Sequence, residues 1–258
     1  MRLRRLTIAL IPLLASGAYA AKDSCFECHS VMEGMSVVYK DDVHYHNAIG
    51  CADCHGGDPK EDDQNVSMSA ERGFKVRGTR QDTPEYCGRC HVHPLAAYRA
   101  SVHGKRLAAS HSEGAECVDC HSVHNIRAAG DPLSPAHPRH VTETCAKCHA
   151  ATADLFRKSP HGPVFISRQM AGCTVCHASH GTEPASRALL TGKNSVCARC
   201  HAAESAGGKA AAEIARLVGS LETAGPGSNE VLARVRRAVH SFDVAAVRRA
   251  AEPAVAGR

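Results

Sequence analysis

Cysteine and histidine dominate the chemistry available to this chain, which has 14 Cys and 18 His among its 258 residues. Every cysteine belongs to a Cys-x-x-Cys-His motif, and none is left over. The seven motifs are CFECH at 25–29, CADCH at 51–55, CGRCH at 87–91, CVDCH at 117–121, CAKCH at 145–149, CTVCH at 173–177 and CARCH at 197–201. Two thiols three positions apart, followed by an imidazole, can hold a flat cofactor by two covalent bonds and one metal bond.

This spacing is the attachment signature of c-type haem. The two thiols form thioethers with the vinyl groups of one macrocycle, and the adjacent histidine ligates the iron as the proximal ligand. The pattern predicts seven covalently attached haems c. The attaching residues are Cys25, Cys28, Cys51, Cys54, Cys87, Cys90, Cys117, Cys120, Cys145, Cys148, Cys173, Cys176, Cys197 and Cys200, and the proximal ligands are His29, His55, His91, His121, His149, His177 and His201.

Three other uses of the cysteines fit the pattern less well. Seven disulfides do not require a histidine after every second cysteine. Zinc sites built from paired CxxC units would use an even number of pairs and need no adjacent histidine. A thioredoxin-like redox site is expected as one motif in a βαβ setting.

The composition argues against an ordinary apolar core, because the chain has no Trp, five Phe and five Tyr. The motifs begin 24 to 36 residues apart, with Gly- and Pro-rich turn signals between them, as in residues 56–59 and 131–135. With so little chain around each macrocycle, we expect the haems to pack against one another and form much of the core. The predicted fold is mainly α with extensive irregular loops, a haem-stack core and little or no β-sheet. Each motif should lie on or end a short helix, with a longer helix near 94–102.

Eleven histidines remain as candidates for the opposite, distal face of the irons, since two neutral imidazoles make a six-coordinate electron-transfer haem. An internal repeat selects four of them. Ser-x-His-Gly precedes the motifs at 117 and 173, and another histidine follows each motif histidine by three residues. The distal ligands predicted from this repeat are His103, His124, His161 and His180.

The pattern SxHG…CxxCHxxH and the stretch CADCHGGDP at 51–59 resemble the multihaem c-type cytochromes with doubled CxxCH motifs, in the broad class III and NapC/NirT-like group. The resemblance covers about residues 25–201. It implies periplasmic or extracellular electron transfer, mostly by bis-histidine haems. The family pattern also favours His44 as a distal ligand, with His46 as the alternative.

Two points remain: the role of His240, and the one haem that has no assigned distal ligand. His240 lies in a C-terminal tail that is expected to be helical over 209–224 and again from about 229, where Ser228 would cap the second helix. Leu232, Val235, Val239 and Phe242 recur at helical spacing and should face the haem domain, so His240 beside them could ligate an iron. One haem then has no assigned distal ligand. The remaining candidates for it are His93, His111, His137, His140 and the sulfur of Met68.

The N-terminus has the features of a secretory signal, with basic residues, a short apolar run and an Ala-Tyr-Ala site for cleavage after Ala20. An uncleaved membrane anchor is the alternative. We therefore expect a signal peptide at 1–20, a seven-haem domain at 21–202 and a helical hairpin at 203–258 packed on it, with no membrane span after cleavage. The net charge of +5 falls to +2 without the signal, and haem propionates would make it acidic, so nucleic-acid binding is not expected.

The leading functional hypothesis is a periplasmic electron carrier without catalytic residues. Its donor would be a membrane quinol dehydrogenase or a periplasmic protein, and its acceptor a terminal reductase or an outer-membrane complex. A second hypothesis is an oxidoreductase that acts on a small nitrogen or sulfur compound at one five-coordinate haem. A third is a subunit of a cytochrome filament or membrane redox complex.

Overall fold

The computed structural model describes residues 23–32, 39–76, 78–109, 114–192 and 195–252. Within these ranges the secondary structure is α-helix and 3-10 helix joined by turns and irregular segments, and there is no β-strand. The prediction of a mainly α fold with extensive loops is confirmed. The expected signal peptide and His111 lie outside the described residues.

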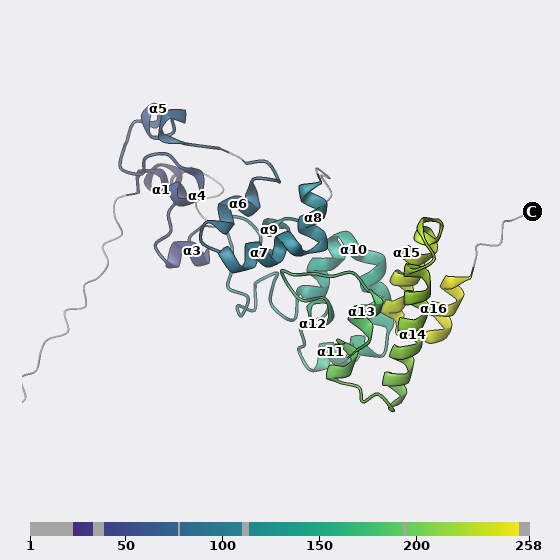
Figure 1. The fold of residues 1–258 in the computed structure, drawn as a ribbon. Coiled ribbons are helices and arrows are strands. Elements are labelled where there is room, and N and C mark those ends of the chain that lie inside the picture. Colours follow the sequence, from purple (N-terminus) through teal and green to yellow (C-terminus); the bar gives the residue numbers. More distant parts are fainter. Residues whose placement is uncertain (1–22, 33–38, 77, 110–113, 193–194, 253–258) are drawn as a thin grey trace, which may run out of the picture.

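The helices follow one another along an elongated molecule (Figure 1). At the N-terminal end lie α1 (Ser24–His29), α3 (Val43–His46), α4 (Cys51–His55), α5 (Gln64–Ser67) and η1 (Ala70–Arg72). The middle contains α6 (Thr83–Gly88), α7 (Val92–Ala100), α8 (Val102–Ala108), α9 (Cys117–His121), α10 (Val141–Lys158), α11 (His161–Ser167), α12 (Thr174–His177), α13 (Arg187–Leu190) and η2 (Cys197–Arg199). At the C-terminal end lie α14 (Ala206–Glu222), η3 (Pro226–Ser228), α15 (Asn229–Ala238), η4 (Val239–Ser241) and α16 (Val244–Ala251).

Each motif lies on a helix or at its end, as the spacing predicts. Most of these helices are too short to be stable alone, because a single turn does not repay the cost of nucleation. Side-chain caps start several helices: Asp23, Asp42 and Ser101 each accept a hydrogen bond from a backbone N–H of the first turn. The longer helix α10 leaves helical geometry at His149, the last residue of its motif.

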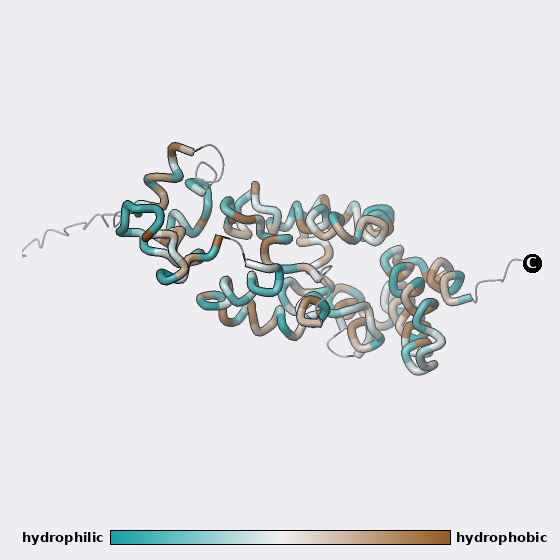
Figure 2. The backbone as a smooth tube through the Cα atoms, turned by 90° about the horizontal axis from the view of Figure 1, so that it is seen from above, coloured by the Kyte–Doolittle hydropathy of each residue, from teal (hydrophilic) through white to brown (hydrophobic). Residues whose placement is uncertain are grey.

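Apolar side chains are spread thinly along the chain, and hydrophilic and hydrophobic stretches alternate along the tube in Figure 2. The largest buried apolar cluster belongs to the C-terminal helices. It contains Leu190, Ile214, Ala215, Val218, Leu232, Val235, Val239 and Val247.

The tail differs from the expected arrangement in three respects. A third helix, α16, packs on α14 and α15. Leu232 and Val235 pack within this three-helix cluster, whereas Val239 and Phe242 face the part of the molecule that carries the motifs, as expected. Ser228 does not cap α15 with its side chain; its hydroxyl donates to the carbonyls of Leu221 and Gly225.

We predict that Ile214→Ala lowers the free energy of unfolding by about 2–5 kcal/mol, because it leaves a cavity in the C-terminal cluster, where Ile214 is 4% exposed. Ile166→Ala is the matched control. Ile166 is 73% exposed, so the same change should alter stability by less than about 0.5 kcal/mol. Urea unfolding of the holoprotein followed by circular dichroism measures both. Equal effects of the two substitutions would contradict the packing described.

Candidate haem-binding site

One continuous cavity runs through the motif-bearing part of the molecule, with a volume of about 3480 Å³. A pocket for a single ligand occupies roughly 300–1,000 Å³, so this cavity has room for several. Divided among seven motifs, its volume is about 500 Å³ each. Its lining includes the seven motif histidines and every cysteine except Cys148.

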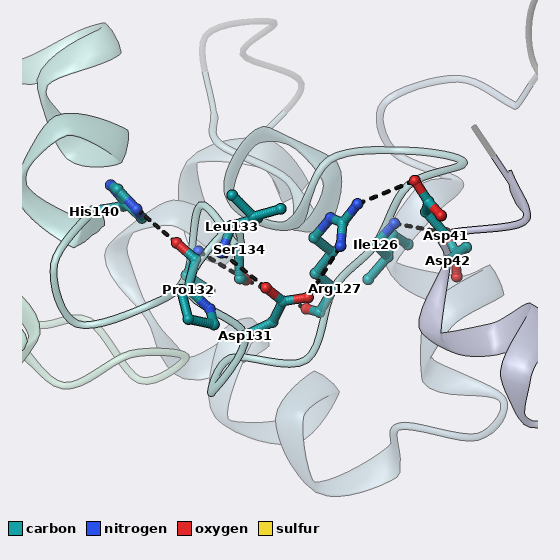
Figure 3. Close-up of polar contacts among 10 residues, drawn as sticks. Asp41, Asp42, Ile126, Arg127, Asp131, Pro132, Leu133, Ser134 and His140 are labelled. Atoms are coloured by element: carbon teal, nitrogen blue, oxygen red, sulfur yellow. Dashed lines mark hydrogen bonds and ion pairs between the residues drawn. The ribbon is translucent and has the colours of Figure 1, made fainter.

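The cavity also separates the remaining histidines into two groups. Six further histidines line it, and they are the six expected distal ligands His44, His103, His124, His161, His180 and His240. The other described histidines, His46, His93, His137 and His140, are not part of the lining. His137 and His140 contact each other, and His140 Nε2 lies 2.9 Å from the carbonyl oxygen of Pro132 (Figure 3).

Each of these six histidines faces a motif histidine at nearly the same separation. The distances between ring centroids are 6.0 Å for His44–His91, 5.9 Å for His124–His55, 6.2 Å for His103–His149, 6.0 Å for His180–His121, 5.8 Å for His161–His201 and 5.8 Å for His240–His177. Metal–imidazole bonds of about 2 Å on both sides of one metal ion place the ring centroids about 6 Å apart. The spacing therefore fits two axial ligands of one iron.

The pairs fall into two alternating classes. Motif histidines 55, 121 and 177 face a histidine 59 to 69 residues later in the chain, and motif histidines 91, 149 and 201 face one 40 to 47 residues earlier. In the first class the two rings are within 25° of parallel. In the second class the interplanar angles are 83°, 33° and 86°. The two histidines of each pair therefore come from different parts of the chain.

The backbone differs between the two classes as well. After His55, His121 and His177 the chain turns at Gly56, Ser122 and Ala178, whose φ angles are +70°, +70° and +60°. Left-handed φ is unusual for Ser and Ala and costs conformational energy. The turn ends each short helix at the motif histidine, and the residues that follow His121 and His177 line the cavity as well.

Burial favours the neutral form of five of these imidazoles, which is the form that can bind a metal. Burial is the main cause that lowers the pKa of His103, His121, His124, His161 and His240 below its usual value. A low pKa keeps the ring neutral, with a free nitrogen lone pair for a metal. In three rings Nδ1 lies 2.7–3.1 Å from a backbone carbonyl oxygen, in the pairs His55–Lys75, His177–Glu183 and His240–Arg237. That contact orients the ring and leaves Nε2 for the metal.

His161 and His44 depart from this arrangement. His161 Nδ1 is buried without a hydrogen-bond partner, and its ring packs on Phe242 with centroids 4.1 Å apart. His44 Nδ1 lies 2.9 Å from a carboxylate oxygen of Asp42. Asp42 was not identified from the sequence, although its place two residues before His44 and at the start of a helix is the available signal.

The cysteines are free thiols in the structure and all lie in its described ranges, so both thiols of each motif are available for thioether bonds. Thiols of consecutive motifs are neighbours. The Cys117 thiol donates a hydrogen bond to Cys87, which lowers the pKa of Cys87 and raises that of Cys117, and Cys145 donates to Cys173 in the same way. Other contacts link the remaining neighbours: α1 packs on α4 and α9 on α10, Arg89 donates to the carbonyl oxygen of Cys54, and Arg199 donates to that of Val175. The motifs therefore follow one another in space in their chain order.

The Ser-x-His-Gly repeat has a structural explanation at both of its copies. Ser101 accepts a hydrogen bond from the backbone N–H of Gly104, and Ser159 accepts one from His161, so each serine caps the turn that carries the histidine. A Cβ atom at Gly104 would overlap the carbonyl oxygen of Tyr98, and one at Gly162 would overlap that of Arg157. Glycine is needed because each histidine-bearing helix starts against the end of the preceding helix.

Three family models match the chain. The cytochrome c3 model matches residues 43–149, the doubled CXXCH motif model residues 161–206, and the cytochrome c554 and c-prime model residues 13–56. No curated protein and no solved structure matches it. With the site geometry, these matches identify a multihaem c-type cytochrome that binds haem c covalently and transfers electrons.

The matched families and the helices of the structure also bear on partners and on membrane insertion. Cytochromes of these families act with redox partners and are usually extracytoplasmic. Among the described residues, no helix combines the length and the apolar character needed to cross a bilayer.

We predict that Gly104→Ala destabilises the holoprotein by about 1–3 kcal/mol, because the added methyl group forces the His103 helix away from Tyr98. Gly130→Ala is the matched control, since a Cβ atom there meets no atom within 4 Å. Thermal or urea unfolding compares them. If both substitutions leave stability unchanged, the close approach at Gly104 is not required.

Proposed function

We propose that the protein carries seven haems c and conducts electrons along them, from the haem at Cys25 and Cys28 to the haem at Cys197 and Cys200 or in the reverse direction. The observation that carries this proposal is the order of the motifs. Consecutive thiol pairs lie next to each other around one cavity, so seven macrocycles would follow one another in the same order.

The residues have simple roles in this function. Each pair of cysteines holds one macrocycle, and the motif histidine binds one face of its iron. Six irons are capped by the facing histidines His124, His44, His180, His103, His240 and His161, in the order of the second to the seventh motif. Bound haem iron supplies a one-electron couple between the ferric and ferrous states. The two facing histidines would hold each of these six haems on both sides, in its ferric and in its ferrous state.

Export and partners complete the proposal. The N-terminal pattern supports export to the periplasm with cleavage after Ala20, and thioether formation from free thiols fits an extracytoplasmic protein. The donor is then a membrane quinol dehydrogenase or another periplasmic protein, and the acceptor a terminal reductase or an outer-membrane complex.

The first haem has a different environment. Within the described residues, the ring of His29 has no contact with a second histidine ring, whereas the six other motif histidines do. Met32 and Met68 line the same cavity, and methionine ligation raises the potential of a haem relative to bis-histidine ligation. This haem is where chemistry on a small molecule would occur, which is the second candidate function.

The intact mass of the purified holoprotein should equal that of the polypeptide plus seven haems, because all seven motifs supply both thiols. Replacing Cys197 and Cys200 by serine should remove one haem. The control is a pair of exposed serines changed to alanine, Ser179 and Ser220, which should retain all seven. A wild-type mass with fewer than seven haems would refute the count.

Carbon monoxide should bind to no more than one haem in the reduced protein, because six irons have histidines on both faces. The ferric electron paramagnetic resonance spectrum should show low-spin haems of two kinds. Nearly perpendicular ligand planes, as in His44–His91 and His161–His201, leave the iron orbitals almost degenerate and give a more anisotropic signal. Binding of carbon monoxide to several haems would contradict the pairing and favour catalysis over conduction.

A further inference from the structure

Asp42 is a buried carboxylate beside one of the proposed iron ligands. Its side chain is 1% exposed, and it lies at the start of α3, where it caps the helix that carries His44. We propose that Asp42 lowers the reduction potential of the third haem, the one attached at Cys87 and Cys90, through its hydrogen bond to the ring of His44. This inference rests on the proposed role of His44 as the ligand that faces His91.

Three contacts hold the carboxylate in place. Oδ1 accepts a hydrogen bond of 2.8 Å from the backbone N–H of His44 and lies 2.9 Å from the Nδ1 atom of the same ring. Oδ2 accepts one of 2.6 Å from the backbone N–H of Ile126 (Figure 3). The two backbone N–H groups donate to the carboxylate oxygens, and Nδ1 of His44 donates as well when Nε2 of the same ring binds a metal.

The position of Asp42 also isolates its charge. Arg127, the arginine drawn in Figure 3, is 3.2 Å from Asp41 and 3.1 Å from Asp131, so its charge is balanced by two other carboxylates. Asp41 is 65% exposed, and its charge is screened by water. The charge of Asp42 is surrounded by protein and acts over a longer range.

A carboxylate partner changes the ligand strength of an imidazole. When Nδ1–H donates to a carboxylate, the other ring nitrogen becomes more basic and donates more strongly to the metal. The ferric state carries one more positive charge than the ferrous state, so both the stronger ligand and the nearby negative charge favour the ferric state and lower the potential.

The other proposed ligands lack this feature. Within the described residues, His44 is the one histidine whose ring nitrogen lies within hydrogen-bond distance of a carboxylate. The rings of His55, His177 and His240 contact neutral backbone carbonyls, and His161 Nδ1 has no partner. The carboxylate of Asp42 next to its ligand therefore distinguishes the third haem from the other bis-histidine haems.

Asp42 also stands between two haem sites. Ile126, which donates to Oδ2, lies two residues after His124, the proposed distal ligand of the second haem. The charge of Asp42 reaches His124 and Cys54 of that site. An electron that moves between the second and the fourth haem would therefore pass through a third haem of lower reduction potential. No bond would be made or broken.

The test is a potentiometric titration of the holoprotein followed by electron paramagnetic resonance. Asp42→Asn keeps the size of the side chain but removes its charge and one acceptor oxygen. We expect the equilibrium constant for reduction of the third haem to rise about tenfold, which is about 59 mV for a one-electron couple. The anisotropic signal is expected for the nearly perpendicular pairs His44–His91 and His161–His201, and the third haem is the one of these two whose signal changes in His44→Met.

Asp41→Asn is the matched control, since it removes the same charge one residue away without a contact to His44. Its effect should be much smaller. Unchanged potentials in Asp42→Asn, or the same shift in both variants, would overturn the inference. Mass and visible spectra establish first that each variant keeps its full set of haems.

His44→Met separates this inference from the proposed function and applies even if Asp42→Asn does not assemble. If no haem in His44→Met acquires the charge-transfer band of methionine ligation, His44 is not a ligand and the proposed pairing fails. If one haem acquires it, that haem in the wild-type protein should have been among those of lowest potential. A wild-type potential in the upper half of the set would refute the role of Asp42 while leaving the pairing intact.

Discussion

A haem whose iron has two protein ligands needs one on each face of its macrocycle, and the tertiary structure provides six pairs of facing histidines that could meet this need. One face is covered by the histidine next to the attaching cysteines, which the local sequence provides. The other face needs a histidine from another segment, 40 to 69 residues away in the six observed pairs. Each proposed iron would therefore join two distant segments, as a disulfide joins two cysteines.

This arrangement explains how a chain with few aromatic residues and many short helices keeps a defined shape. In the described residues, the largest apolar cluster lies in the C-terminal helices, at one end of the molecule. The remainder surrounds a cavity whose walls are motif residues and loops. Metal and covalent bonds can replace an apolar core in small folds, because they supply the free energy that limited burial cannot. The C-terminal helices also contribute to the site directly, since η4 carries His240.

The order of the motifs connects this construction with electron transfer. Because consecutive motifs are neighbours, the distance between successive irons would be set by packing within one chain instead of by the docking of separate domains. The potential at each iron can then be adjusted locally, by what contacts the ligand ring. The partners of the rings differ along the chain, from a carboxylate at His44 to backbone carbonyls at His55 and His177 and no partner at His161.

The sequence by itself was sufficient for the class of protein. The Cys-x-x-Cys-His spacing predicts haem c from local geometry alone, and the absence of alternating patterns predicts a helical fold without sheet. It also led to the same six histidines that line the cavity opposite the motifs: the repeat indicates His103, His124, His161 and His180, the family resemblance His44, and the helical spacing of the tail His240.

Only the tertiary structure showed which histidine faces which motif. His44 lies next to the second motif in sequence but faces His91 of the third, and His124 follows the fourth motif but faces His55 of the second. Irregular loops connect these residues, and loop geometry cannot be derived from spacing. For the same reason the role of Asp42 could not be predicted from the sequence, because its partner Ile126 is 84 residues away. Local spacing determines what a short segment can bind, whereas the packing of distant segments decides what completes each site.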